Sequence, residues 1–284
     1  MFVESKVLKA VAIFMITVLF TACSSKSMNN SERRITTQVY FGDKNLEGLS
    51  EAQIIDILKN YSKETNIEPR NASFNQEKWS VVPETNGKRL NIEKTLNMIL
   101  NSSRGEKVSP IVEDIKPDIT SDKVKSNIVE IGNCSTEILD DQKSRVSNIE
   151  VAGSYIDNTK IMPNEEFSFN GTLGKRTSEK GYKKAPIIIK SKDGPKKGYG
   201  VGGGICQIAS TLYGAALESG LKITERHPHS KKVGYVEDGK DATVVYGGAD
   251  LKFINSLSNP VIIKVAITGE KVTVKLYEIR DIQL

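Results

Sequence analysis

One stretch decides how the second half of this chain is interpreted: Val201-Gly202-Gly203-Gly204-Ile205-Cys206-Gln207-Ile208-Ala209-Ser210-Thr211-Leu212-Tyr213. Three consecutive glycines disfavour both helix and strand, because glycine loses the most backbone freedom on folding. After them, apolar residues recur at helical spacing until Gly220 supplies a stop; they are Ile205, Ile208, Leu212 and Ala216. The pattern therefore predicts a glycine turn followed by a helix that carries Cys206 in its first turn.

The position of Cys206 favours a reactive thiolate. The first turn of a helix presents unpaired backbone N–H groups and the positive end of the helix dipole, and both stabilise a negatively charged sulfur. A thiol nucleophile also needs a base, and the chain has two histidines, in Arg226-His227-Pro228-His229-Ser230 shortly after the predicted helix. Because nucleophilic catalysis requires a cysteine and a histidine close in space, the sequence indicates a Cys–His site.

Three other interpretations of Cys206 stay open. A single cysteine on an amphipathic helix can be a small core residue, with the histidines in a loop that has no role. Cys206, His227 and His229 would supply three zinc ligands, but no second thiol accompanies them, so we expect no metal and no cofactor. Cys134 and Cys206 would form a disulfide in an exported protein, and that would abolish the nucleophile.

The remaining pattern predicts a mixed α+β fold. The elements expected in the first half are helices at 50–63 and 91–100, strands at 72–83 and 108–115, and a short turn capped by Thr120. The strands expected in the C-terminal third are 233–237, 243–246, 251–255, and a hairpin of 261–267 with 272–279. The prediction is a small N-terminal α+β module followed by a β-rich α+β domain with a helix that bears the nucleophile.

The first 23 residues are predicted to be a lipoprotein signal sequence. The apolar run from Ala10 to Phe20 is too short to span a bilayer, since spanning needs about 20 residues. Phe20-Thr21-Ala22-Cys23 then resembles a bacterial lipobox, which makes Cys23 the lipidated residue; an uncleaved signal anchor is the alternative. Residues 24–34 are rich in Ser, Asn and Lys and predict a flexible tether. We therefore expect an extracytoplasmic protein, lipid-anchored to the outer face of the cell membrane.

Motifs across residues 135–255 resemble the VanW domain in consistent order. They are Asn164-Glu-Glu-Phe167-Ser168-Phe169-Asn170, Thr172-Leu-Gly174-Lys-Arg176-Thr177, Gly181-Tyr182-x-x-Ala185, Gly202-Gly-Gly-Ile-Cys206-Gln207, Ser210-Thr211-Leu212-Tyr213, Glu225-Arg226-x-x-His229-Ser230, Asp241-Ala242 and Asp250-Leu251-Lys252-Phe253. Cys134 departs from the family pattern, which tends to carry an aromatic residue near that position. The preceding module resembles, more loosely, the peptidoglycan-binding domain that often stands before VanW domains, through Val82-Pro83-Glu84-x-x-Gly87.

The resemblance implies a role in the cell wall. Some VanW-domain proteins are described as L,D-transpeptidases that use a cysteine. Carried over to matching positions, this makes Cys206 the nucleophile and His229 the base, with His227 unused. The resemblance thus favours transfer between peptidoglycan stem peptides as the reaction.

The residues themselves suggest partners for this chemistry. Backbone N–H groups around Gly203, Gly204 and Cys206 are candidates for an oxyanion hole, because a helix start presents donors in the required place. The candidates for positioning the substrate or the histidine are Gln207, Arg226 and Ser230. The candidates for a third group that orients His229 are Tyr235, Asp241 and Asp250.

Composition and charge limit the classes of molecule that the protein is expected to bind. The chain has 284 residues, 38% hydrophobic and 26% charged, which is typical of a globular protein. A net charge of +5 is too mild to indicate nucleic-acid binding. Between Lys175 and Lys197, however, nine basic residues are accompanied only by Glu179 and Asp193. This run is either a solvated face or a surface that attracts stem carboxylates and anionic wall polymers.

The sequence thus predicts four segments: a signal sequence at 1–23, a tether at 24–34, a peptidoglycan-binding-like module at 35–126 and a VanW domain at 127–284. The predicted function is a peptidoglycan L,D-transpeptidase that forms 3→3 cross-links through a cysteine thioester. The alternatives are a non-catalytic accessory protein that binds peptidoglycan in glycopeptide resistance, and a cysteine peptidoglycan hydrolase.

Overall fold

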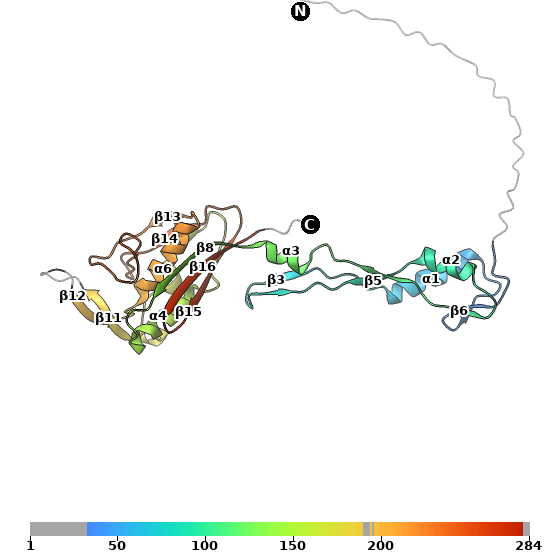
Figure 1. Ribbon diagram of the computed structural model, residues 1–284, viewed down its shortest axis with the longest axis horizontal. Coiled ribbons are helices and arrows are strands. Elements are labelled where there is room, and N and C mark those ends of the chain that lie inside the picture. The colour runs from blue at the N-terminus through green and yellow to red at the C-terminus, as the bar shows by residue number, and fades with distance from the viewer. Residues whose placement is uncertain (1–32, 190–193, 195, 281–284) are drawn as a thin grey trace, which may run out of the picture. The chain divides into compact units, whose positions relative to one another are not determined.

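The computed structural model describes residues 33–189, 194 and 196–280 (Figure 1). The predicted signal sequence, the lipidation site Cys23 and most of the tether lie outside the described residues. Helices and strands follow one another along the chain, so the mixed α+β prediction is confirmed. Among the described residues, no helix is long and apolar enough to cross a membrane. The chain divides into two compact units: unit 1 comprises the residues up to Tyr61 and Ile92–Ile111, and unit 2 comprises Ser62–Asn91 and Val112–Leu284.

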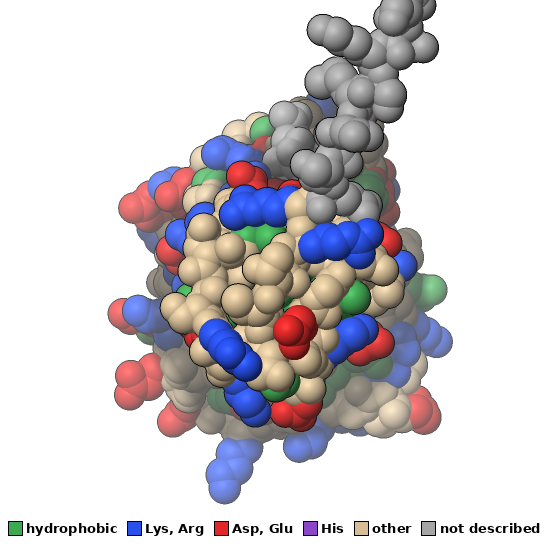
Figure 2. Space-filling model, turned by 90° about the vertical axis from the view of Figure 1, so that its right-hand side faces the viewer, with side chains coloured by type: hydrophobic (Ala, Val, Ile, Leu, Met, Phe, Trp, Pro, Cys, Tyr) green, Lys and Arg blue, Asp and Glu red, His purple; other side chains and the backbone are tan. Residues whose placement is uncertain are grey.

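Unit 1 is built on a three-stranded sheet in the order β2-β1-β6, from β1 (Val39–Phe41), β2 (Lys44–Asn45) and β6 (Glu106–Val108). Two amphipathic helices accompany it, α1 (Glu51–Thr65) and α2 (Ile92–Leu100), close to the predicted ranges. The predicted capping box of α1 is confirmed, because Ser50 Oγ accepts from the Gln53 N–H at 3.4 Å and Gln53 Oε1 accepts from the Ser50 N–H at 2.9 Å. In the face drawn in Figure 2, basic and acidic side chains are interspersed, so that face carries no single sign of charge.

Unit 2 opens with small paired strands. Two of them, β3 (Ser73–Asn75) and β4 (Ser80–Val82), form a hairpin where one strand at 72–83 was predicted. The turn between them contains Trp79 at a φ of 47°, which a continuous strand does not allow. The predicted strand 108–115 is also interrupted, because Pro110 lies between β6 and β7 (Val112–Ile115) and has no N–H to donate. β7 pairs with β5 (Gly87–Leu90), and α3 (Ser121–Ser126) begins at the predicted Thr120 cap.

The core of unit 2 is an antiparallel sheet in the order β8-β16-β15-β9, from β8 (Ile128–Glu137), β16 (Lys271–Ile279), β15 (Val261–Ile267) and β9 (Lys160–Ile161). The predicted C-terminal hairpin is confirmed in β15 and β16. Alternate residues of β16 are buried, so the sheet has one core face. Two helices, α4 (Lys143–Ile156) and α6 (Ile205–Glu218), pack on the sheet and on each other.

Smaller elements complete unit 2 around these helices (Figure 1). A second sheet has the order β10-β14-β13, from β10 (Glu166–Ser168), β13 (Lys222–Glu225) and β14 (Lys252–Ile254). A separate hairpin joins β11 (Lys184–Ile189) to β12 (Lys196–Val201), directly before the glycines and α6. The short helix α5 (Phe169–Leu173) and the 3-10 turn η1 (Ser178–Lys180) lie between β10 and β11.

The predicted strands at 233–237 and 243–246 are wrong, because both segments lie in a loop between β13 and β14. Ala242 and Val244 are buried in the core of unit 2, and this burial produced the alternating pattern. The backbone of the loop bonds to other groups, as Ala242 N–H does to Ser210 Oγ at 2.9 Å. A polar–apolar alternation therefore arose without strand pairing.

The packing of β8 on α6 gives a stability prediction. A Cβ added at Gly132 would lie 2.3 Å from the backbone oxygen of Ala215, so Gly132→Ala forces the strand away from the helix. We expect a loss of about 1–3 kcal/mol in the free energy of unfolding, as for other overpacked cores. Gly269→Ala is the matched control, since nothing lies within 4 Å of the added carbon, and its effect is expected within about 0.5 kcal/mol. Urea unfolding of both variants checks this, and equal stabilities would contradict it.

Candidate active site

The glycines before α6 fix the start of the helix. Gly204 is the N-cap residue at a φ of 103°, a backbone conformation that side-chain-bearing residues rarely adopt. A Cβ on Gly203 would lie 2.5 Å from the backbone oxygen of Pro186, so only glycine lets the chain pass β11 this closely. Asn148 of α4 donates to the Gly203 carbonyl at 2.9 Å and holds the turn against the helix layer. The predicted glycine turn and helix are therefore confirmed.

Cys206 is the second residue of α6 and is partly buried. Its thiol donates to the Val244 carbonyl at 3.7 Å. The backbone N–H of Gly203 bonds to Gly200, but the N–H groups of Gly204 and Cys206 have no partner among the residues that the structure describes. The start of α6 thus offers two unpaired backbone donors, which is the type of group that forms an oxyanion hole.

His229 lies close to Cys206 and is held from its other side. Its Nδ1 is 2.6 Å from Asp241 Oδ2, and its backbone N–H donates to the same oxygen at 2.6 Å. Because Nδ1 is occupied, Nε2 is the ring nitrogen left for the thiol. Burial opposes a positive charge on the ring, but hydrogen bonding with Cys206 and Asp241 outweighs it and raises the pKa of His229. The arrangement suits a base that takes a proton from sulfur and keeps it.

Asp241 is the third member of this chain of contacts. Arg226 Nη2 lies 2.7 Å from Asp241 Oδ1, and Arg226 Nε donates to the Asp241 carbonyl at 2.6 Å. Burial would raise the pKa of Asp241, but hydrogen bonds from His229 and the charge of Arg226 outweigh it and lower that pKa. Arg226 also lies over the ring of Tyr213, 5.5 Å from its centre. Cys206, His229, Asp241 and Arg226 therefore form one connected series.

Two other candidates for the orienting group have different partners. Asp250 accepts from Ser168 Oγ at 2.6 Å and from the Asn170 N–H at 2.8 Å, and so fixes the start of α5. Tyr235 is partly buried and hydrogen-bonds with Ser210, and removal from solvent raises the pKa of its hydroxyl. Of the three candidates, Asp241 is the one that contacts the ring of His229.

The other candidates from the sequence, Gln207, Ser230 and His227, do not belong to the series from Cys206 to Arg226. Gln207 is buried, and its amide bonds to Thr136 Oγ1 at 2.9 Å and to Arg145 Nη2 at 2.7 Å. Ser230 is exposed on the loop. His227 bonds instead to Glu225 Oε1 at 2.9 Å. Among the described residues, no group of three or more His, Cys, Asp and Glu side chains is arranged to hold a metal ion.

Two arginines near the thiol were missed by sequence reasoning as site residues. Arg145 of α4 and Arg176, which follows α5, both interact electrostatically with Cys206, and burial lowers the pKa of each guanidinium. Arg176 Nη2 is buried without a hydrogen-bond partner among the described residues. Arg176 lies in one of the motifs that resemble the VanW domain, Thr172-Leu-Gly174-Lys-Arg176-Thr177, whereas nothing in the sequence distinguished Arg145 from a surface arginine.

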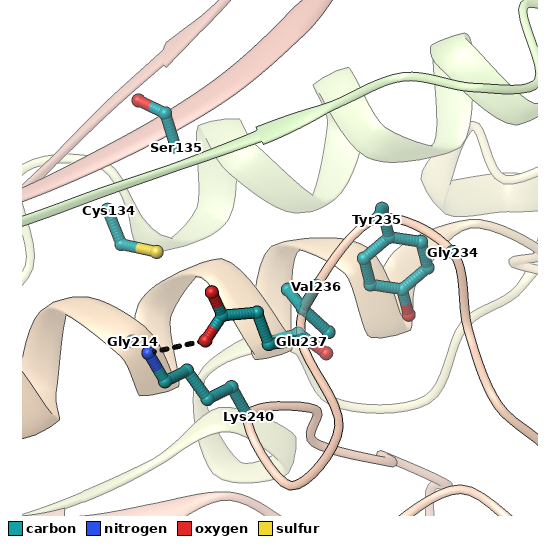
Figure 3. A pocket seen from close by; sticks show the side chains of 9 residues that line it. Cys134, Ser135, Gly214, Gly234, Tyr235, Val236, Glu237 and Lys240 are labelled. Atoms are coloured by element: carbon teal, nitrogen blue, oxygen red, sulfur yellow. Dashed lines mark ion pairs between the residues drawn. The ribbon is translucent and has the colours of Figure 1, made fainter.

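Cys134 belongs to a separate cavity of about 480 Å³ on β8 and α6 (Figure 3). Burial raises the pKa of its thiol, and a Cβ at Gly214, two turns along α6 from Cys206, would lie 2.5 Å from its sulfur. Both cysteines are free. The Cys134–Cys206 disulfide is therefore not formed, and the thiol of Cys206 is available for chemistry.

Comparison with known proteins assigns the family. The model described as "VanW like protein" matches residues 144–277, which include every member of the series from Cys206 to Arg226 and both arginines. The chain is 36% identical to "Uncharacterized protein YoaR" of Bacillus subtilis over 224 residues, which cover 78% of this chain and 72% of that protein. The chain belongs to the VanW-like family.

Other matches agree with this VanW-like assignment. The "Vancomycin B-type resistance protein VanW" of Enterococcus faecalis is 28% identical over 136 residues, which cover 46% of this chain and 48% of that protein. Residues 34–111 match the model described as "Putative peptidoglycan binding domain", which associates this VanW-like chain with the cell wall. No solved structure matches.

The contact between His229 and Asp241 predicts how the histidine titrates. Because its pKa is raised above the ordinary 6.5, His229 stays protonated to higher pH, and its ion pair with Asp241 is lost only as the pH rises through the raised value. Asp241→Asn removes the charge and is expected to lower the pKa of His229. NMR titration of the two histidine rings measures this directly. Asp238→Asn, which alters an exposed pair with Lys232, is the control, and an unchanged His229 pKa in Asp241→Asn would contradict the assignment.

Proposed function

We propose that this VanW-like protein is a cysteine L,D-transpeptidase that joins peptidoglycan stem peptides by 3→3 cross-links. The observation that carries the proposal is the series Cys206–His229–Asp241 at the start of α6. The match to a peptidoglycan-binding domain supports the choice of substrate. Lipid anchoring at Cys23 outside the cytoplasmic membrane, and attraction of anionic wall polymers to the basic run, belong to the same proposal.

The first half of the reaction forms a thioester. His229 takes the proton of the thiol, and the Cys206 sulfur attacks the carbonyl carbon of the third stem residue. The unpaired N–H groups of Gly204 and Cys206 stabilise the negative charge that develops on the carbonyl oxygen. As the bond to the terminal D-alanine breaks, the His229 imidazolium gives its proton to the leaving amine. The acyl group stays on sulfur and His229 is neutral.

The second half transfers the acyl group. An amine of a neighbouring stem attacks the thioester carbonyl, and neutral His229 removes a proton from that amine as the new amide bond forms. The carbon–sulfur bond breaks and returns the thiolate beside the imidazolium. Asp241, held by Arg226, keeps the ring in the orientation that both halves need. Water in place of the amine would give hydrolysis at the same site.

The proposal predicts which variants lose cross-linking. The purified protein is incubated with disaccharide-tetrapeptide, and mass spectrometry follows 3→3 dimers and free D-alanine. Cys206→Ala is expected to give no dimers, since the nucleophile is absent, and His229→Ala to slow the reaction by about 100-fold or more because proton transfer is lost. Cys134→Ala and His227→Ala are matched controls that keep the activity.

The outcomes of this assay separate the alternatives. Loss of D-alanine without dimers identifies a hydrolase that uses the same thiol. No turnover by the parent protein, with Cys206 shown to be free by mass, indicates a protein that binds peptidoglycan without reacting and overturns the proposal.

A further inference from the structure

A second cavity of unit 2, of about 260 Å³, lies between the β11–β12 hairpin and the loop that follows His229. Its lining includes Lys196 and Lys197 from the start of β12, Lys231 and Lys232 from the loop, and Arg145 from α4. We call it the basic pocket. Of the cations described in this lining, the two lysines of β12 belong to the basic run of the sequence. The fold joins them to cations from two other segments.

The charges of the basic pocket are poorly balanced. Among the residues that the structure describes, five cations line it and Asp140 is the one acidic residue. Lys232 pairs with Asp238 at 2.9 Å, but Lys196, Lys197 and Lys231 have no ion pair with any residue that the structure describes. An anion that enters the pocket therefore meets ammonium groups that need not release another carboxylate first.

Arg145 is the most buried of these cations, with 8% of its surface exposed. Its guanidinium donates to the Asp140 carbonyl at 3.2 Å and to the Gln207 amide oxygen at 2.7 Å, and both acceptors are neutral. The Asp140 carboxylate attracts the guanidinium without forming an ion pair among the described residues, so Arg145 keeps part of its attraction for another anion. Arg145 is thus a fixed positive group at the inner wall of the basic pocket.

The basic pocket is linked to the first turn of α6 through Arg145, which bonds to Gln207, the residue next to Cys206. Arg145 and Tyr235 both line it, and both interact electrostatically with Cys206. Lys231 follows His229 by two residues along the loop. The pocket is thus built on the same loop as His229 and on a side chain that is tied to the helix turn carrying Cys206.

The size and walls of the pocket indicate a peptide. Its volume of about 260 Å³ lies just below the range for small-molecule sites, about 300–1,000 Å³, so it holds part of a ligand. Leu139, Ile188 and Val233 give it apolar walls between the cations. A short peptide offers apolar groups and carboxylates within this space, whereas a phosphate polymer has no apolar side chains to place against the walls.

We propose that the basic pocket is the subsite that binds a carboxylate of the stem peptide whose carbonyl is attacked by Cys206. This inference rests on the proposed function and adds the group that is recognised and the residues that recognise it. Arg145 and the unpaired lysines hold the carboxylate, and they thereby align the scissile bond with the thiol.

Binding is measured on the Cys206→Ala protein, which cannot turn over, by calorimetry with a stem tetrapeptide and with the same peptide whose carboxylates are amidated. We expect the free-acid peptide to bind and its affinity to fall with added salt. Lys197→Gln with Lys231→Gln should weaken binding by about tenfold or more, because two charge-assisted contacts are lost. Lys222→Gln with Lys271→Gln removes the same charge from exposed strand positions outside the pocket lining and serves as the control.

Several results would overturn the subsite. They are equal affinity for the acid and amidated peptides, equal effects of the pocket and control pairs, no binding of the peptide at all, and binding of a polyglycerol phosphate in its place. With Cys206 intact, the pocket variants should raise KM and leave kcat nearly unchanged, since the lysines bind and do not react. The proposed function fails separately, when the parent protein forms no dimers.

Discussion

The Asp241 carboxylate is the interaction on which the rest of the site depends. One oxygen holds both the backbone and the ring of His229, and the other accepts from Arg226. The next residue, Ala242, bonds to Ser210 of α6, whose hydroxyl also bonds to the Cys206 carbonyl at 2.8 Å. The loop that carries His229 and the residue Cys206 are therefore both bonded to the same turn of α6. The loop between β13 and β14 has no helix or strand, yet it fixes the ring of His229. The hydrogen bonds of Asp241 and Ala242 take the place of the backbone hydrogen bonds that a β-sheet would supply.

Packing around α6 explains why this helix is a rigid base for the site. One side lies on the sheet of β8 and β16, and the other faces α4, which also supplies Arg145 and Asn148. Asn148 fixes the glycine turn, and Gln207 joins Arg145 to β8 through Thr136. Gln207 is thus a structural link beside Cys206. These contacts hold the start of α6, with its unpaired N–H groups, in place, and donors held in this way need no rearrangement when charge develops.

Much of the helix and hairpin structure followed from sequence patterns. The glycines, the helical spacing after Cys206, the Ser50 capping box and the alternation in β15 and β16 are local signals, and each gave the observed element. The strands expected in the loop at 233–237 and 243–246 failed because Val244 is buried by a turn that bonds to α6, a long-range cause that no local pattern carries.

The site was accessible from sequence only in part. A cysteine at a predicted helix start and two histidines shortly after it indicated a Cys–His site, and the resemblance to the VanW domain selected His229 over His227. The choice of Asp241 over Tyr235 and Asp250 needed the fold, since distance along the chain does not tell which side chain reaches the ring of His229. Arg145 was hidden for the same reason: its charge faces inward only because α4 packs on α6.

The direct tie between His229 and Asp241 also has a consequence for how such a protein can diversify. The chain between them leaves and returns to the same carboxylate, so residues 230–240 form an excursion whose two ends are pinned together. Lys231 and Lys232 lie on this excursion. Insertions and substitutions there alter what the neighbouring pocket presents to a ligand without moving the imidazole. Under the proposed function, reactivity and selectivity would lie in separate parts of one loop, and evolution could change the second while the first stayed constant.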